Sequence, residues 1–181
     1  MGDLNQAAFA VWITGLPASG KSTIARALRE QLTGRGTNVA VLESDTVRKM
    51  VEEEPSYDPE ARARFYRYLA YAGVLLTQHG IPVIFDATAN RRIYRDWARQ
   101  QIPRFFEVFI DCPLETCIGR DPKGIYRKAS EGEAQTVPGL QEPYEPPEAA
   151  DVIIDSEHEP PATAAQRIVE KLVERGNFRG N

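Results

Sequence analysis

Residues 15–23 read Gly-Leu-Pro-Ala-Ser-Gly-Lys-Ser-Thr and match the pattern G-x-x-x-x-G-K-[ST] of a phosphate-binding loop. The apolar run at residues 7–13 before it predicts a buried parallel strand, and the apolar spacing of residues 22–32 after it predicts a helix. Glycines bring backbone N–H groups close to phosphate oxygens, and the helix N-terminus adds partial positive charge. An accidental glycine-rich turn is the alternative, but it would not need this strand and helix. The sequence therefore predicts a site for a nucleoside triphosphate.

Side chains of the loop suggest individual roles. We expect Lys21 to reach the β- and γ-phosphates and the Ser22 hydroxyl to ligate Mg²⁺. The candidate nucleotide-binding residues are the whole loop: Gly15, Leu16, Pro17, Ala18, Ser19, Gly20, Lys21, Ser22 and Thr23.

Composition limits the possible function classes. The 181 residues carry a net charge of −4, which argues against a general nucleic-acid binder because phosphate contacts dominate such binding. Residues 62–104 nevertheless hold eight arginines and no lysine. Most of these arginines are typical of a solvated helical face, although two or three would suffice for an anion site.

The two cysteines give an expectation about location. Cys112 and Cys117 have neither the spacing of a redox motif nor partners for a zinc site, so we interpret both as packing residues. The sequence shows no secretory signal and no apolar run near eighteen residues. We therefore expect a cytoplasmic protein with reduced thiols and no membrane segment.

Short apolar runs alternate with helical stretches along the chain. Strands are predicted at 39–42, 81–85, 105–110 and 152–154, and helices at 58–79, 91–101, 113–119 and 162–175. The expected fold is α/β: a three-layer P-loop NTPase fold with a five-stranded, mainly parallel sheet and helices on both faces, forming one kinase domain over residues 1–181. Residues 121–147 show no clear period and predict a mobile loop, part of a lid over about 120–147.

Ligands of open parallel sheets bind beyond the carboxyl ends of the strands, which places Asp45 and Asp86 in one cleft with the phosphate loop. Asp45 would orient or deprotonate an acceptor hydroxyl, and Arg48 would hold an anionic group of the acceptor. An N-cap aspartate with a surface arginine is the alternative. Glu43 would hold Mg²⁺ through water. Asp86 would either organise Mg²⁺ or cap a helix.

Arg62 lies on the continuation of an apolar helical stripe formed by Phe65, Leu69, Ala72 and Leu76. A buried arginine needs an anionic partner, and a bound ligand and a structural ion pair are both open interpretations. Asp86, Ala87 and Thr88 begin a polar loop that runs to Arg92 after the third strand, and these three are candidate acceptor-binding residues.

Longer segments carry a family resemblance. Residues 107–115 (EVFIDCPLE) and 120–129 (RDPKGIYRKA), with 143–147 (PYEPP) and 152–155 (VIID), resemble the adenylylsulfate kinases (APS kinases). These P-loop enzymes use ATP and Mg²⁺ to phosphorylate the 3′-hydroxyl of adenosine 5′-phosphosulfate (APS). The resemblance covers roughly residues 8–175 and implies ATP as the nucleotide.

The resemblance also implies roles for individual residues. It places Arg120 near ATP and Lys123 in the closing lid, with Lys21 and Asp45 as catalytic residues. Its implied acceptor-binding residues are Asp45, Arg48, Arg62 and Lys123, with Tyr57 and Val137 at the positions of two aromatic residues that sandwich the APS adenine. A homodimer would be unsurprising.

The departures from the family pattern lie on the acceptor side. At two positions where the family has asparagine, this chain has Thr46 and Phe65, and at the position of a lid lysine it has Gln135. In place of the family segment F-I-S-P-Y-R, residues 85–91 read FDATANR. The D-A-T-x-N form resembles P-loop kinases that act on other hydroxyls. An acceptor other than APS (a phosphorylated small molecule, a nucleotide or a polynucleotide end) is therefore the second hypothesis. A nucleotide-binding module without catalysis is the third, and Lys21, Ser22, Asp45 and Arg48 argue against it.

Overall fold

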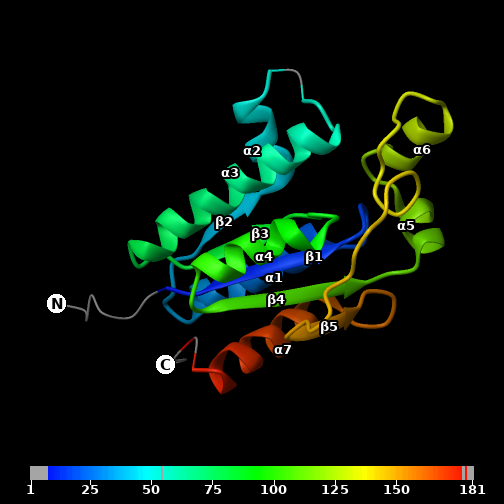
Figure 1. Cartoon of the computed structure of the whole chain (residues 1–181). Helices are drawn as coiled ribbons and strands as arrows, with labels where there is room; N and C mark the ends of the chain where they lie inside the picture. The colour runs from blue at the N-terminus through cyan, green and yellow to red at the C-terminus, as the bar shows by residue number, and fades with distance from the viewer. Residues whose placement is uncertain (1–7, 54, 177, 179–181) are drawn as a thin grey trace.

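The computed structural model describes residues 8–53, 55–176 and 178, and Figure 1 shows their arrangement around one sheet. The sheet has five strands in the order β2-β3-β1-β4-β5, and every pairing is parallel. Their bounds are β1 (Ala10–Gly15), β2 (Ala40–Glu43), β3 (Val83–Asp86), β4 (Phe105–Asp111) and β5 (Val152–Asp155). The predicted fold class is thus confirmed, and the sheet is parallel throughout. Ala7, the first residue of the predicted first strand, lies outside the described residues.

Helices cover both faces of the sheet (Figure 1). The helices are α1 (Lys21–Gly34), α2 (Ser44–Val51), α3 (Pro59–Gln78), α4 (Arg92–Gln101), α5 (Leu114–Arg120), α6 (Ile125–Ser130) and α7 (Pro161–Glu174). On one face, α1 and α7 bury Leu28 and Ile168 against the strands. On the other, α3 and α4 bury Phe65 and Ala98. Two apolar cores therefore fix β1 in the middle of the sheet and hold the loop that follows it.

The connection between α5 and β5 differs from the predicted structureless loop. It contains α6, and Asp121 holds the start of this helix because its carboxylate accepts hydrogen bonds from the backbone N–H of Ile125 (2.7 Å) and of Arg127 (2.9 Å). A third apolar cluster includes Cys117, Tyr126 and Val137. The expectation that residues 121–147 lack regular structure was wrong: the segment has its own helix and small core.

Residues 120–147, the segment predicted to be a lid and called the lid below, pack directly on the phosphate loop. The Tyr126 hydroxyl donates to the Pro17 carbonyl at 3.0 Å. Gly139 has φ +85°, and a Cβ atom there would come within 2.4 Å of Leu16 Cδ2. Only glycine permits such a close approach with this backbone conformation. In the described ranges, no helix is both long and apolar enough to cross a membrane.

Candidate active site

The phosphate loop leaves β1 at Gly15 and enters α1 at Lys21. Gly15 has φ +155°, and a Cβ there would lie 2.7 Å from the Ile110 carbonyl oxygen and 2.9 Å from Ser19 Oγ. Lys21 Nζ donates to the carbonyls of Leu16 (2.7 Å) and Gly15 (3.2 Å), so the loop wraps around the ammonium group. The loop therefore has the tight, cationic form that the sequence predicts.

Polar groups of this loop fit the phosphates of a nucleotide. Ser19 Oγ is buried and has no hydrogen-bond partner among the described residues, and a buried hydroxyl without a partner is energetically costly. Burial lowers the pKa of Lys21, an effect that the charges of Asp86 and Asp45 oppose. Bound phosphate oxygens would accept from Ser19 and pair with Lys21. Ser22 and Thr23 at the start of α1 are exposed, which leaves the Ser22 hydroxyl accessible to Mg²⁺.

Arg120 joins this loop to the end of β5. Its guanidinium donates to the Ser19 carbonyl (3.5 Å) and to the hydroxyl (3.1 Å) and carbonyl (2.9 Å) of Ser156. The structure thus places Arg120 beside the phosphate loop, and its contact with ATP stays a prediction.

The carboxyl ends of β2 and β3 bring two acidic residues together. Glu43 and Asp86 are partners in the strand register, and Asp86 is only 5% exposed. Burial raises the pKa of Asp86, while the charge of Lys21 and a hydrogen bond with Ser22 lower it. A carboxylate beside Ser22 is suited to organise Mg²⁺, because this ion prefers hard oxygen ligands and bound water.

Asp45 lies in the first turn of α2, on the same side of the cleft. Its carboxylate pairs with Lys123 of the lid at 2.6 Å, and both side chains are half-exposed. Burial lowers the pKa of Lys123, but the hydrogen bond and charge of Asp45, together with Glu43, outweigh this and raise it. The lid therefore reaches across the cleft to the predicted catalytic carboxylate.

The buried Arg48 and Arg62 both lie close to the ring of Tyr57. The Arg48 guanidinium lies 3.7 Å from the Phe65 ring centroid and 4.9 Å from that of Tyr57, and it pairs with Glu52 at 3.1 Å. Arg62 lies 5.8 Å from the same Tyr57 ring. The alternative of a surface arginine at position 48 was wrong, because Arg48 is 5% exposed.

Three predicted acceptor residues show mainly structural contacts. Ala87 is fully buried, and its carbonyl accepts from Trp12 Nε1 at 3.1 Å. The Thr88 carbonyl accepts from Thr14 Oγ1 at 2.6 Å. Val137 is buried in the lid cluster, where its side chain packs with Cys117 and Tyr126. A contact of these residues with the acceptor stays a prediction.

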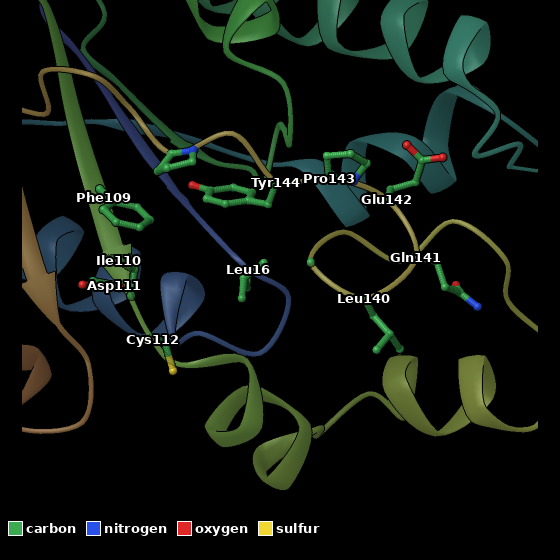
Figure 2. Close-up of a pocket in the computed structure, with 12 residues that line it drawn as sticks. Leu16, Phe109, Ile110, Asp111, Cys112, Leu140, Gln141, Glu142, Pro143 and Tyr144 are labelled. Carbon is green, nitrogen blue, oxygen red and sulfur yellow. The ribbon is translucent and has the colours of Figure 1, made fainter.

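An open cavity of about 590 Å³ adjoins the phosphate loop (Figure 2). Its wall is formed by Leu16 of the phosphate loop, by Asp111 at the end of β4 with the following Cys112, and by residues 139–144 and 146 of the lid. The Tyr144 ring stacks on the Phe109 ring at a centroid distance of 6.1 Å. The loop is thus accessible from this side although the lid covers part of it.

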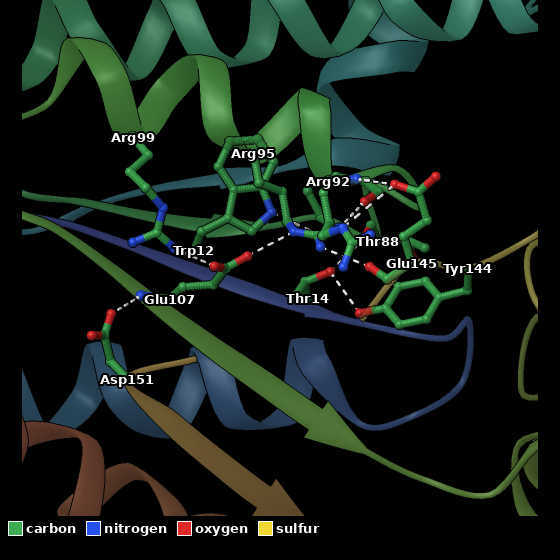
Figure 3. A network of polar contacts seen from close by, with 12 residues as sticks. Trp12, Thr14, Thr88, Arg92, Arg95, Arg99, Glu107, Tyr144, Glu145 and Asp151 are labelled. Atoms are coloured by element: carbon green, nitrogen blue, oxygen red, sulfur yellow. Dashed lines mark hydrogen bonds and ion pairs between the residues drawn. The ribbon is translucent and has the colours of Figure 1, made fainter. Parts of the chain in front are cut away.

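A polar network fastens the returning lid to the body of the fold (Figure 3). Arg95 is 1% exposed; its Nε donates to Glu107 at 2.7 Å and its Nη2 to the Glu145 carbonyl at 2.7 Å. Arg99 pairs with the same Glu107 carboxylate. The Tyr144 hydroxyl contacts Thr14 Oγ1 at 3.0 Å. Most arginines of this region were interpreted as solvated. This interpretation is wrong for Arg95, whose partner Glu107 lies on β4.

The sequence reasoning also missed two residues that contact Arg62. Asn90, in the loop after β3, and Thr136, in the lid, both accept hydrogen bonds from its guanidinium. The polar loop at residues 85–92 gave a signal for Asn90. No local signal marked Thr136, because its contact depends on how the lid closes.

A phosphate loop at the centre of a parallel sheet, a carboxylate across the cleft and a lid together define a P-loop kinase. Comparison with known proteins identifies the family. Residues 7–155 match the sequence model of the family Adenylylsulphate kinase. The chain is 37% identical to a probable adenylyl-sulfate kinase of Pyrococcus abyssi, covering 93% of this chain and 97% of that protein. The chain therefore belongs to the adenylylsulphate kinase family.

Solved structures agree with this assignment. The structure of the Mycobacterium tuberculosis APS kinase in complex with AMPPNP and APS is similar with a TM-score of 0.87 and 32% identity, covering 92% of this chain and 98% of that one. A hexameric APS kinase from Thiobacillus denitrificans is similar with a TM-score of 0.72 and 25% identity, covering 98% of this chain and 31% of that one.

Proposed function

We propose that the protein transfers the γ-phosphoryl group of ATP to the 3′-hydroxyl of APS, giving 3′-phosphoadenosine 5′-phosphosulfate and ADP. The observation that carries the proposal is the arrangement of the cleft. A phosphate loop with a buried Lys21 lies within electrostatic reach of Asp45, and the buried Arg48, on the same helix as Asp45, shares the Tyr57 ring with the buried Arg62. Family membership and the likeness to an APS kinase that holds both AMPPNP and APS support this reading.

In this reaction the acceptor oxygen forms a bond to the γ-phosphorus while the bond from that phosphorus to ADP breaks. Asp45 orients the hydroxyl and takes its proton. Lys21 and the loop N–H groups stabilise the charge on the transferred group, and Arg48 and Arg62 hold the anionic end of the acceptor. Ser22, with Asp86 beside it, would hold Mg²⁺, and the ion would neutralise negative charge of the nucleotide phosphates. Because phosphoryl transfer depends mostly on positioning and electrostatics, this set of residues is sufficient.

The test is the release of ADP from ATP and Mg²⁺, measured with and without APS, with Lys21→Ala as the inactive control. We expect release that depends on APS and falls by about two to three orders of magnitude in the variant, because a donor to the transition-state charge is lost. Equal release with and without APS would overturn the choice of acceptor. The search would then move to other phosphorylated hydroxyl compounds.

Three further expectations remain proposals. A cytoplasmic location is supported by the free, buried thiols of Cys112 and Cys117. Self-association as a homodimer is supported by family membership alone, and light scattering after gel filtration would test it. We also propose that the whole chain is one kinase domain, since the described elements pack on one sheet.

A further inference from the structure

Three described arginines are buried, namely Arg48, Arg62 and Arg95, and their surroundings differ in charge. Arg48 has a counter-ion, because Glu52 lies 3.1 Å away. Arg95 is 1% exposed and has a counter-ion, because the carboxylate of the buried Glu107 lies 2.7 Å away. Arg62 is 6% exposed, and its partners are neutral oxygens: Asn90 Oδ1 (3.3 Å), the Tyr57 carbonyl (3.3 Å), and the Thr136 carbonyl (2.8 Å) and hydroxyl (3.3 Å). Among the described residues, no carboxylate pairs with Arg62.

A buried cation without a counter-ion is costly, so the fold keeps Arg62 in a state that favours an incoming anion. Neutral oxygens fix the direction of the guanidinium but leave its net charge available. Where this chain needs a buried arginine only for structure, as at Arg95, it provides a carboxylate. The contrast between the two sites indicates that the missing counter-ion at Arg62 belongs to a ligand.

Asn90 is placed to fix the orientation of the Arg62 guanidinium. It is 1% exposed, and both ends of its amide are engaged: Oδ1 accepts from Arg62, and Nδ2 donates to the Pro143 carbonyl at 3.0 Å. The Asn90 backbone carbonyl accepts from the Glu145 N–H at 2.7 Å. Because Nδ2 faces a carbonyl, the amide oxygen must face the guanidinium. The side chain therefore cannot turn away without losing both bonds.

We propose that Asn90 is a positioning residue, which holds Arg62 in place without neutralising it and thereby sets the affinity for the anionic acceptor. The inference rests on the proposed function, since it assumes that the acceptor carries a phosphosulfate or phosphate group. Aspartate has nearly the same shape as asparagine but would supply the carboxylate that the site omits. The acceptor would then compete with an internal ion pair for Arg62.

Two variants at this position separate the charge effect from a structural effect. Asn90→Asp keeps the shape and adds a negative charge but loses the Nδ2 donor to the Pro143 carbonyl, whereas Asn90→Ala removes both side-chain bonds and adds no charge. If Asn90 preserves the charge of Arg62, the KM for APS rises by about tenfold or more in Asn90→Asp and by less in Asn90→Ala. A merely structural role instead predicts that the KM for ATP rises together with the KM for APS and that the melting temperature falls in both variants.

The experiment measures ADP release at varied APS and at varied ATP for wild type and both variants, together with their melting temperatures. Asn38→Asp, at an exposed asparagine, is the matched control for the change in net charge. We expect the KM for ATP to stay within about twofold in Asn90→Asp. If Asn90→Ala does not fold, the comparison of the KM for APS between Asn90→Asp and Asn38→Asp still tests the inference.

The outcomes distinguish the inference from the proposed function. A wild-type protein that releases no ADP in response to APS overturns the proposed function, and the inference with it. An active wild type whose KM for APS is unchanged in Asn90→Asp overturns the inference alone. A parallel rise of both KM values with a lower melting temperature also overturns it, because that pattern reports general damage to the fold.

Discussion

Two aspartates near Lys21 differ in their surroundings, and this difference assigns them different tasks. The side chain of Asp45 is 52% exposed and pairs with a lysine of the lid, so it lies where an acceptor can replace that partner. Asp86 is 5% exposed, and its surroundings are Lys21, Ser22 and Glu43. Asp45 is therefore suited to meet the acceptor, and Asp86 is suited to the metal side of the phosphates.

For Asp45, we expect Asp45→Asn to lower kcat by about 10²- to 10⁴-fold, because the hydroxyl proton then has no carboxylate to accept it. The KM for ATP should change little, since Asp45 does not belong to the phosphate loop. Steady-state kinetics with varied ATP measures both quantities, and Asp96→Asn on the exposed face of α4 is the control. A variant with near-normal kcat would contradict the role of Asp45 as proton acceptor.

For Asp86, the raised pKa predicts how stability depends on pH. Burial raises the pKa above its ordinary value of 3.8, so the folded protein keeps this proton when the unfolded chain has lost it. The contribution of Asp86 to stability is full below about pH 4 and is lost as the pH rises through the raised pKa. Because asparagine does not titrate, Asp86→Asn removes this loss of stability at higher pH.

The melting temperature of Asp86→Asn relative to wild type should therefore increase between about pH 4 and pH 7, even though the variant loses activity. Thermal unfolding at a series of pH values measures the difference. A difference that stays constant over this range would show that Asp86 does not titrate as its burial requires.

Helix α3 and strand β3 show how closely the elements around the cleft are packed. Gly73 lies in the middle of α3, and a Cβ atom there would come within 2.0 Å of Phe85 Cζ. The ring of Phe85 is itself fixed, because it stacks on Trp12 of β1 at 4.4 Å between centroids. The glycine thus lets the helix that carries Arg62 approach the sheet.

Gly73→Ala should destabilise the fold by about 1–3 kcal/mol, because the added methyl group overpacks this contact. Gly34→Ala, at the end of α1 where a Cβ meets nothing within 4 Å, should be neutral or slightly stabilising. Urea denaturation of both variants measures the free energy of unfolding. Equal stabilities would mean that α3 shifts away from the sheet without cost.

What the sequence could predict at this scale depends on how local the signal is. The phosphate loop and its flanking strand and helix were predictable because three adjacent segments carry the pattern. Helix α6 was not, because its six residues are held by Asp121 and by the contact of Tyr126 with Pro17 rather than by an apolar period. The partners of Arg62 and Arg95 were missed for a similar reason, since Asn90, Thr136 and Glu107 come from other elements.

At the scale of the whole molecule, Glu107 connects four parts of the chain. Its carboxylate pairs with Arg95 and Arg99 of α4, and its backbone N–H donates to the Asp151 carboxylate at 2.6 Å, just before β5. Through Arg95 it also reaches the carbonyl of Glu145, where the lid returns to the sheet. Through its carboxylate and its backbone N–H, Glu107 of β4 thus links α4, the approach to β5 and the lid (Figure 3).

Glu107→Ala should therefore reduce the free energy of unfolding by about 3–5 kcal/mol, because it leaves the buried Arg95 without its counter-ion. Glu115→Ala, at an exposed position of α5, should stay within about 0.5 kcal/mol of wild type. Chemical denaturation followed by circular dichroism provides the comparison. A loss below about 1 kcal/mol would show that the remaining carbonyl contacts suffice for Arg95.

The ion pair between Lys123 and Asp45 has a consequence for the hydrolysis of bound ATP by water. While the lid lysine holds the carboxylate, that carboxylate is poorly placed to activate a water molecule, so bound ATP should survive until an acceptor arrives. We expect Lys123→Ala to hydrolyse ATP faster than wild type when no acceptor is present, and unchanged background hydrolysis would contradict this. The lid would then protect the cell from futile consumption of its nucleotide as well as covering the transfer reaction.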